Sequence, residues 1–235
     1  MNKYLNLIFL SIYLLCFTTV TAMEKYVVIN PEGAKVYEQP KFDAKVIAIL
    51  NFGDTIIKKK SNVLKERYFA SNDIILNGYW IKVKVKNKDA YTFSVHYSNK
   101  LSITGIDGKG NPSINLLGAF LRSTNDTVII ELTNSNTTYE TDQLTKWYEH
   151  GKSIETQLDG CKDYSYTYED ATLNEVYFKQ VLDHFFKTQN GQIIPPVSNK
   201  QSEERVEFGD LEATTDLTIQ SKGVDKYVVS YYSCD

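Results

Sequence analysis

Residues 36–56 read VYEQPKFDAKVIAILNFGDTI and residues 78–97 read GYWIKVKVKNKDAYTFSVHY, and these two stretches decide the fold of the N-terminal half. Apolar and basic residues alternate through 79–85, which is typical of a half-buried strand. The alternation resumes at 90–95 after the polar turn at 86–89, so the pair predicts a β-hairpin. The apolar run at 45–50 precedes a Gly-Asp turn and predicts another strand. We therefore expect a small unit made of short strands.

The order of these segments resembles bacterial Src-homology-3-like domains. These domains typically show an S-K-V-I-G-x-L-like strand, a G-D-x-V turn, and then G-W-x-K-V followed by G-Y-V. The matching segments here are AKVIAIL at 44–50, GDTI at 53–56, GYWIKV at 78–83 and AYTF at 90–93. Ala90 replaces the family's glycine, and the segment at 58–76 is longer than usual. The resemblance implies a small β-barrel over residues 24–100 that binds a ligand, such as a cell-wall peptide or glycan, and rarely performs chemistry.

Aromatic residues and lysines of this unit form the candidate ligand surface. Aromatic faces stack on sugar rings or hold extended peptides, and lysines at the rim can meet anionic wall polymers. The candidate residues are Tyr37, Tyr79, Trp80, Tyr91, Tyr97, Lys82 and Lys84. The alternative is that these aromatic side chains pack in the core, and for each one separately core packing is the stronger reading.

The second half of the chain resembles no family that its residues identify. Residues 101–115 are polar and rich in glycine, and predict a linker. Residues 116–235 predict a strand-rich α+β domain with one clear helix, so the chain as a whole is mostly β. Asp170 can cap that helix, and apolar residues from Leu173 to Phe185 recur at helical spacing. Tyrosines alternate with polar residues at 163–168, which suits a strand with one aromatic face.

Residues 1–22 predict a secretory signal peptide. Lys3 provides a positive start, an apolar run follows, and Val20 and Ala22 are small residues at the positions that a signal peptidase reads. We expect cleavage after Ala22 and export to the periplasm or beyond. An uncleaved anchor is the alternative, and lipid attachment at Cys16 is disfavoured because Leu15 precedes it. No other apolar run reaches the length of a membrane span, so we expect a protein that is not integral to a membrane.

Two cysteines, Cys161 and Cys234, remain after the signal peptide. An even pair in an exported chain predicts a disulfide, and two free thiols are the alternative. In the chain-entropy treatment, a ring of this size stabilises the fold by about 4 kcal/mol.

Charge is divided unevenly along the chain. Residues 24–100 hold 14 Lys or Arg against 8 Asp or Glu, whereas residues 101–235 hold 11 against 21. A basic first half fits contact with an anionic surface, and solvated loop charges are the equally weighted alternative. The acidic total charge and the expected export argue against nucleic-acid binding.

The patterns that carry catalysis or metal binding are missing from the sequence. Cys161 stands in a tyrosine-rich polar strand without the helix N-terminus that would lower a thiol pKa. The three histidines, His96, His150 and His184, are isolated from one another and from cysteines. A metal site of two His or Cys residues at short spacing is therefore not predicted, and neither is a cofactor.

Our first hypothesis is an exported, non-catalytic envelope protein whose barrel binds peptidoglycan or an envelope protein. A cell-wall hydrolase with its catalytic domain in the second half is one alternative. An inhibitory or immunity-type protein, whose acidic half mimics an anionic ligand, is the other.

Overall fold

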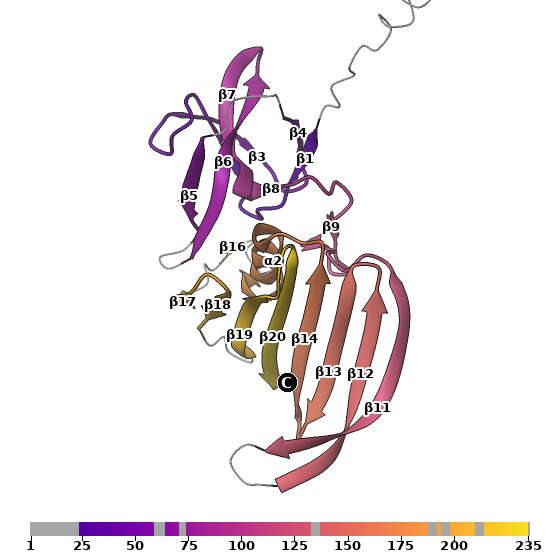
Figure 1. Cartoon of the computed structure of the whole chain (residues 1–235). Helices are drawn as coiled ribbons and strands as arrows, with labels where there is room; N and C mark the ends of the chain where they lie inside the picture. The colour runs from indigo at the N-terminus through magenta and orange to yellow at the C-terminus, as the bar shows by residue number, and fades with distance from the viewer. Residues whose placement is uncertain are drawn as a thin grey trace, which may run out of the picture.

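The computed structural model describes residues 24–58, 64–70, 74–132, 137–187, 192–193, 198–209 and 214–234. The expected signal peptide and Cys16 lie outside these residues. The chain is mostly β, as its sequence predicts, with one α-helix in the described part. Figure 1 shows a small strand-rich unit above a broad curved sheet.

The described strands of the N-terminal unit form two antiparallel sheets and do not close into the small barrel that the sequence resemblance implies. Its strands are β1 (Lys25–Val28), β2 (Ala34–Tyr37), β3 (Val46–Leu50), β4 (Thr55–Ile57), β5 (Lys65–Phe69), β6 (Ile75–Val85), β7 (Lys88–Phe93) and β8 (Tyr97–Ser98). A three-stranded sheet has the order β4-β1-β8, and a five-stranded sheet has the order β3-β2-β7-β6-β5. A single 3-10 turn, η1 (Ser94–His96), separates β7 from β8. The long segment at 58–76 contributes β5 to the second sheet.

Short apolar side chains fill the space between these two sheets. Val28, Val36, Ile81 and Ala90 are fully or almost fully buried there. The turn at 30–33 closes with a hydrogen bond from the Gly33 amide to the Asn30 carbonyl, 2.8 Å long. A side chain at Gly33 would collide with the Leu50 carbonyl, and its φ of +82° favours glycine.

A hairpin connects the two halves. It consists of β9 (Thr104–Ile106) and β10 (Pro112–Ile114), within the residues predicted as a linker. Ile103 and Ile114 are buried in the main core. The connecting segment is thus packed against the protein.

An eight-stranded antiparallel sheet dominates the second half. Its order is β11-β12-β13-β14-β20-β19-β18-β17. The strands are β11 (Phe120–Leu132), β12 (Thr137–Tyr148), β13 (Gly151–Leu158), β14 (Cys161–Glu169), β17 (Ser198–Gln201), β18 (Arg205–Phe208), β19 (Thr214–Ser221) and β20 (Lys226–Cys234). A separate small hairpin pairs β15 (Phe186–Lys187) with β16 (Gln192–Ile193).

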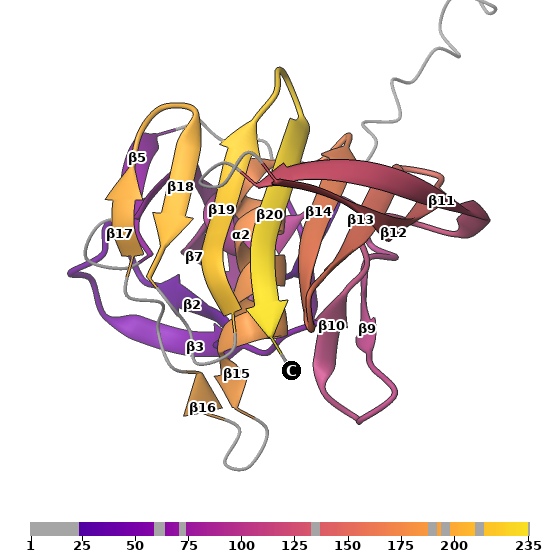
Figure 2. The same cartoon turned by 90° about the horizontal axis from the view of Figure 1, so that it is seen from below.

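The predicted helix lies inside the curve of this sheet (Figure 2). It comprises α2 (Leu173–Gln180), which continues into a π-helical turn, η2 (Val181–Phe185). Its N-cap is Thr172, two residues after the predicted Asp170. Asp170 has a φ of +58°, whereas Thr172 has the extended backbone that an N-cap adopts. Thr172 and Glu175 form a reciprocal capping box.

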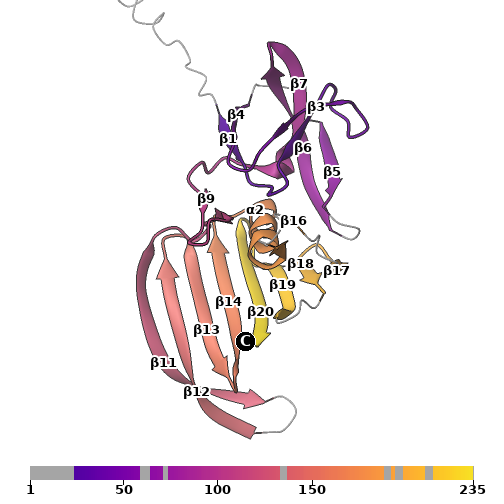
Figure 3. The same ribbon diagram turned by 180° about the vertical axis from the view of Figure 1, so that it is seen from behind.

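One continuous core joins the two halves. It includes Trp80 and Phe93 of the N-terminal unit, Ile114 of the connecting hairpin, and Val176 and Phe178 of α2. The helix therefore packs on the large sheet on one side and on the N-terminal unit on the other (Figures 1 and 3). None of the helices in the described residues is long and apolar enough to cross a membrane.

Candidate functional site

An aromatic cluster covers one face of the five-stranded sheet. Tyr37, Trp80 and Phe93 come from β2, β6 and β7, and Phe42 comes from the loop between β2 and β3. The ring centroid of Phe42 lies 4.9 Å from those of both Trp80 and Phe93, and Tyr37 meets Trp80 edge-on at 5.5 Å. The indole Nε1 of Trp80 donates to Oε2 of Glu66, 2.7 Å away. These contacts fix the rings in one packed array.

One end of the cluster is closed by the helix. Tyr68 of β5 meets the ring of His96 edge-on at 4.7 Å, and His96 lies 6.2 Å from Phe178 of α2. Asn30 Nδ2 donates to Nδ1 of His96 at 3.0 Å, so the neutral ring carries its proton on Nε2. Burial lowers the pKa of His96 to about 3, with Lys35 adding to the effect. This end of the cluster is therefore part of the buried core between the two halves.

The other end of the cluster leads to a polar rim. Tyr91 of β7 is the direct cross-strand neighbour of Tyr37 on one side and of Lys82 on the other. Tyr91 and Lys82 are only half-buried, whereas Tyr37 is 8% exposed. Lys82 Nζ lies 2.7 Å from Oδ2 of Asp89, and this hydrogen bond raises the pKa of Lys82. The rim thus presents an aromatic ring next to a cation.

The structure brings five of the seven predicted residues to this face. Strand alternation places Lys82 and Lys84 on the same side of β6 as Trp80. Tyr79 and Tyr97 belong to the opposite side, where both pack with the second core cluster. Tyr97 is 5% exposed, and its hydroxyl lies 2.8 Å from Oγ1 of Thr92. A single surface formed by all seven residues, as predicted, is therefore not what the fold builds.

Tyr79 takes part in a different arrangement on that opposite side. The ammonium of Lys58 lies 5.1 Å from the Tyr79 ring centroid and 5.5 Å from that of Tyr26. It also pairs with Glu24 at 3.0 Å. Burial works to lower the pKa of Lys58, but the hydrogen bonds to Glu24 and Tyr26 outweigh it and raise this pKa. The arrangement ties β4 to β1.

Sequence reasoning missed three members of the aromatic cluster, namely Phe42, Tyr68 and Phe93. Phe93 alternates with Tyr91 and could have been assigned to the same face from that spacing. Tyr68 lies in KERYF at 65–69, where alternation is weak and only pairing with β6 defines the strand. Phe42 lies in a loop, whose path the sequence pattern does not specify.

A second aromatic array lies on the large sheet. Tyr164, Tyr166 and Tyr168 lie along one face of β14, as their alternation predicts. The ring of Tyr231 on β20 stacks against Tyr164 at 4.9 Å, and His184 of η2 meets Tyr231 edge-on at 4.7 Å. Burial raises the pKa of Tyr166 and, more strongly, that of Tyr168. The array anchors the helix and leaves Tyr164 half-buried.

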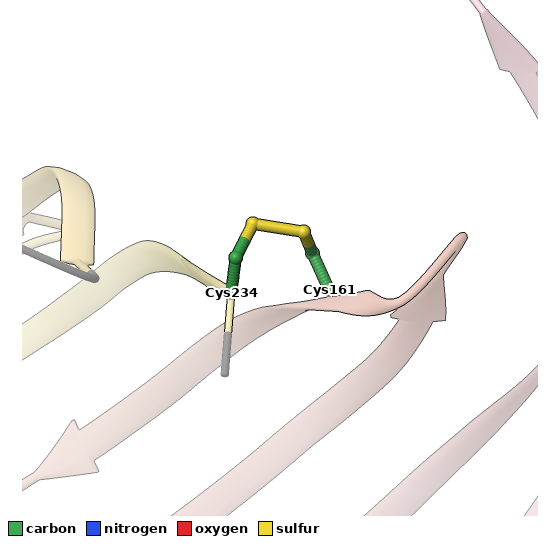
Figure 4. Close-up of a disulfide and its surroundings, with 2 residues drawn as sticks. All are labelled: Cys161 and Cys234. Atoms are coloured by element: carbon green, nitrogen blue, oxygen red, sulfur yellow. A yellow bond between two sulfur atoms is a disulfide. The ribbon is translucent and has the colours of Figure 1, made fainter.

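Cys161 and Cys234 are joined by the predicted disulfide (Figure 4). They are direct cross-strand partners on β14 and β20. Among the residues that the structure describes, no three His, Cys, Asp or Glu side chains gather in a way that could hold a metal ion.

The chain has no match among known families, curated proteins or solved structures.

Proposed function

We propose that this protein is an exported binding protein of the cell envelope, whose N-terminal unit is a Src-homology-3-like module for cell-wall peptide or glycan. The observation that carries the proposal is the row of Tyr37, Tyr91 and Lys82 across three neighbouring strands. Trp80 and Phe42 pack against Tyr37, the buried end of this row. The further support for the module is the resemblance of residues 44–50, 53–56, 78–83 and 90–93 to the sequence pattern of the family.

The row fits a ligand that has both an apolar face and negative charge. A half-buried tyrosine offers an aromatic face for a sugar ring or a peptide side chain, and its rigid ring loses little conformational entropy on binding. Lys82 next to it supplies a positive charge for a carboxylate of the ligand. Its ion pair with Asp89 neutralises part of that charge. Wall peptides and glycans combine sugar rings with carboxylates, which matches this pairing of groups.

Co-sedimentation of the exported protein with purified peptidoglycan tests the proposal. We expect the wild-type chain to sediment with the polymer at low salt and to be released as salt screens the lysine. Tyr91→Ala should weaken binding about fivefold or more, because a contact aromatic side chain typically contributes over 1 kcal/mol. Lys82→Ala should weaken it less and should reduce the salt dependence.

Tyr79→Phe is the matched control, because Tyr79 lies on the opposite face of the sheet. It should bind as the wild type does. A wild-type chain that stays in the supernatant at low salt would refute wall binding. Equal loss of binding in Tyr79→Phe and Tyr91→Ala would place the ligand elsewhere.

A further inference from the structure

β11 forms an open edge of the large sheet. It is 13 residues long and is the last strand on its side of the eight-stranded order. Figures 1 and 3 show its outer side with no described segment next to it. Half of the backbone N–H and C=O groups of an edge strand point outward, so such an edge is a template for another strand. Proteins usually protect edges of this length with charge, proline or short strands.

The far part of β11 projects beyond the rest of the sheet. β12 pairs with β11 along its whole length, but it pairs with β13 only over residues 143–148. Residues 127–131 and 138–142 thus form a two-stranded ribbon, and Ile129 on it is 70% exposed. Such a ribbon is marginally stable alone. At the other end of the strand, Phe120 is 56% exposed.

Three residues in the middle of β11 form a self-complementary pattern. Arg122, Thr124 and Asp126 alternate along one face, with opposite charges at equal distances from Thr124. Arg122 rests on the ring of Trp147, 3.9 Å from its centroid, and Thr124 Oγ1 donates to Asp126 Oδ2 at 2.9 Å. Both charges are therefore held in place on the exposed edge.

We propose that β11 is a dimerisation edge, and that two copies of this chain pair antiparallel through it around a two-fold axis at Thr124. Arg122 of each copy then lies opposite Asp126 of the other, which forms two equivalent ion pairs. Moving the axis to Asp126 would set two aspartates directly opposite each other, which is unfavourable. The large sheets of the two copies join into one continuous sheet.

The exposed apolar residues at the ends of β11 agree with this register. A bulge between Phe120 and Arg122 turns Phe120 to the face of Tyr148, the same face that Ile129 occupies. In the antiparallel pair, Phe120 of one copy approaches the ribbon of the other and is diagonal to Ile129. Diagonal neighbours lie within reach of an aromatic side chain. Pairing thus covers both ends of the strand.

Sedimentation velocity with charge-exchanged variants tests this interface. We expect the oxidised wild-type protein to be dimeric at micromolar concentration. Arg122→Asp and Asp126→Arg should each weaken the dimer tenfold or more, because each creates two like-charge pairs. An equimolar mixture of these two variants should regain dimers, since each mixed pair again brings Arg against Asp. The double exchange in one chain should also dimerise.

Three outcomes of these measurements would contradict the proposed dimer. A monomeric wild type at about 100 μM would overturn it, because specific homodimers are populated well below this concentration. Single variants that stay dimeric would place the interface elsewhere, and a mixture that stays monomeric would refute the register. Circular dichroism confirms that each variant is folded. Hydrogen exchange of the wild type provides a measurement without substitutions: amide protection at 122–126 should rise with protein concentration.

Discussion

Ser98 at the end of β8 donates a hydrogen bond from its Oγ to Oε1 of Glu175 in the first turn of α2. Glu175 is 1% exposed, and its other oxygen accepts from the Thr172 amide at 2.8 Å. Lys100 Nζ lies 3.5 Å from the same carboxylate. One buried side chain thus caps the helix and fastens it to the N-terminal unit.

Replacing Glu175 should therefore destabilise the helix and the junction together. Glu175→Ala removes the capping box and leaves the Ser98 hydroxyl and the Thr172 amide without their acceptor. We expect a loss of about 2–4 kcal/mol in the free energy of unfolding. Urea denaturation followed by fluorescence measures it. Glu169→Ala, which removes an exposed ion pair with Lys226, is the control and should change stability by less than about 1 kcal/mol.

The disulfide secures the C-terminal strand in the middle of the large sheet. β20 lies between β14 and β19, and Cys234 is at its very end. We expect the double variant Cys161→Ala/Cys234→Ala to lose about 4 kcal/mol in the free energy of unfolding. The disulfide closes a loop between residues 73 positions apart, and without it the unfolded chain regains the conformational entropy that this closure removes. Thermal unfolding with and without reductant measures this. An unchanged melting temperature in the double variant would show that strand pairing alone holds β20.

Protonation of His96 should make the fold sensitive to acid. Its pKa is about 3 in the folded state, against 6.5 for the free side chain. Above pH 6.5 both states are neutral, and this site contributes no pH dependence. Between pH 6.5 and 3 only the unfolded state takes up the proton, so stability falls by up to about 1.4 kcal/mol per pH unit.

His96→Gln removes this group, so the unfolding free energy of the variant should fall by about 1.4 kcal/mol less per pH unit than that of the wild type. Urea midpoints at pH 4.5, 5.5 and 6.5 compare the variant with the wild type. Burial also lowers the pKa of His184, so part of the decline should persist in the variant. His150→Gln, at an exposed histidine, is the control and should follow the wild-type curve. An equal slope in His96→Gln and the wild type would show that His96 titrates normally.

Local alternation predicted most of the strands around the aromatic cluster. The predicted hairpin is present as β6 and β7, but β7 ends at Phe93 and the predicted strand residues 94 and 95 belong to η1. The lysines and turn residues made the period visible, although the centres of both strands are buried on both faces. Local alternation does not predict which other part of the protein each face of the hairpin packs against. Tyr79 and Trp80 are adjacent and were assigned to one surface, yet adjacent residues on a strand point to opposite sides. The period of two along a strand divides the predicted aromatic residues between the two faces of the sheet, whereas their number alone does not.

The contact between the two halves was beyond reach of the sequence pattern. His96 and Phe178 are distant along the chain, as are Ser98 and Glu175, and no local period links such pairs. The predicted linker at 101–115 illustrates the same limit. Its glycines are typical of a loose connection, but Ile103 and Ile114 are buried in the shared core. Two isolated apolar residues in a polar segment give too weak a signal to predict packing.

The side chain of Gln201 forms a second link between the halves, which provides a local test of that junction. Its Oε1 accepts from the Ile75 amide at 2.6 Å, and its Nε2 donates to the Ile75 carbonyl at 2.9 Å. Gln201 therefore acts as an added strand residue at the start of β6. Gln201→Ala should lower the free energy of unfolding by about 1–3 kcal/mol, because the partly buried amide and carbonyl of Ile75 lose their hydrogen-bond partner.

Hydrogen exchange at the Ile75 amide distinguishes this link from general destabilisation. In Gln201→Ala the Ile75 amide should exchange about tenfold faster or more, since its protection depends on that one acceptor. Amides at the centre of β6, such as that of Ile81, pair with β7. Their exchange rates should change only as far as the global stability of the protein changes. Lys200→Ala changes an exposed neighbour and should leave Ile75 protected. If Ile75 keeps its protection in Gln201→Ala, the two halves are fastened through Glu175 and the shared core instead.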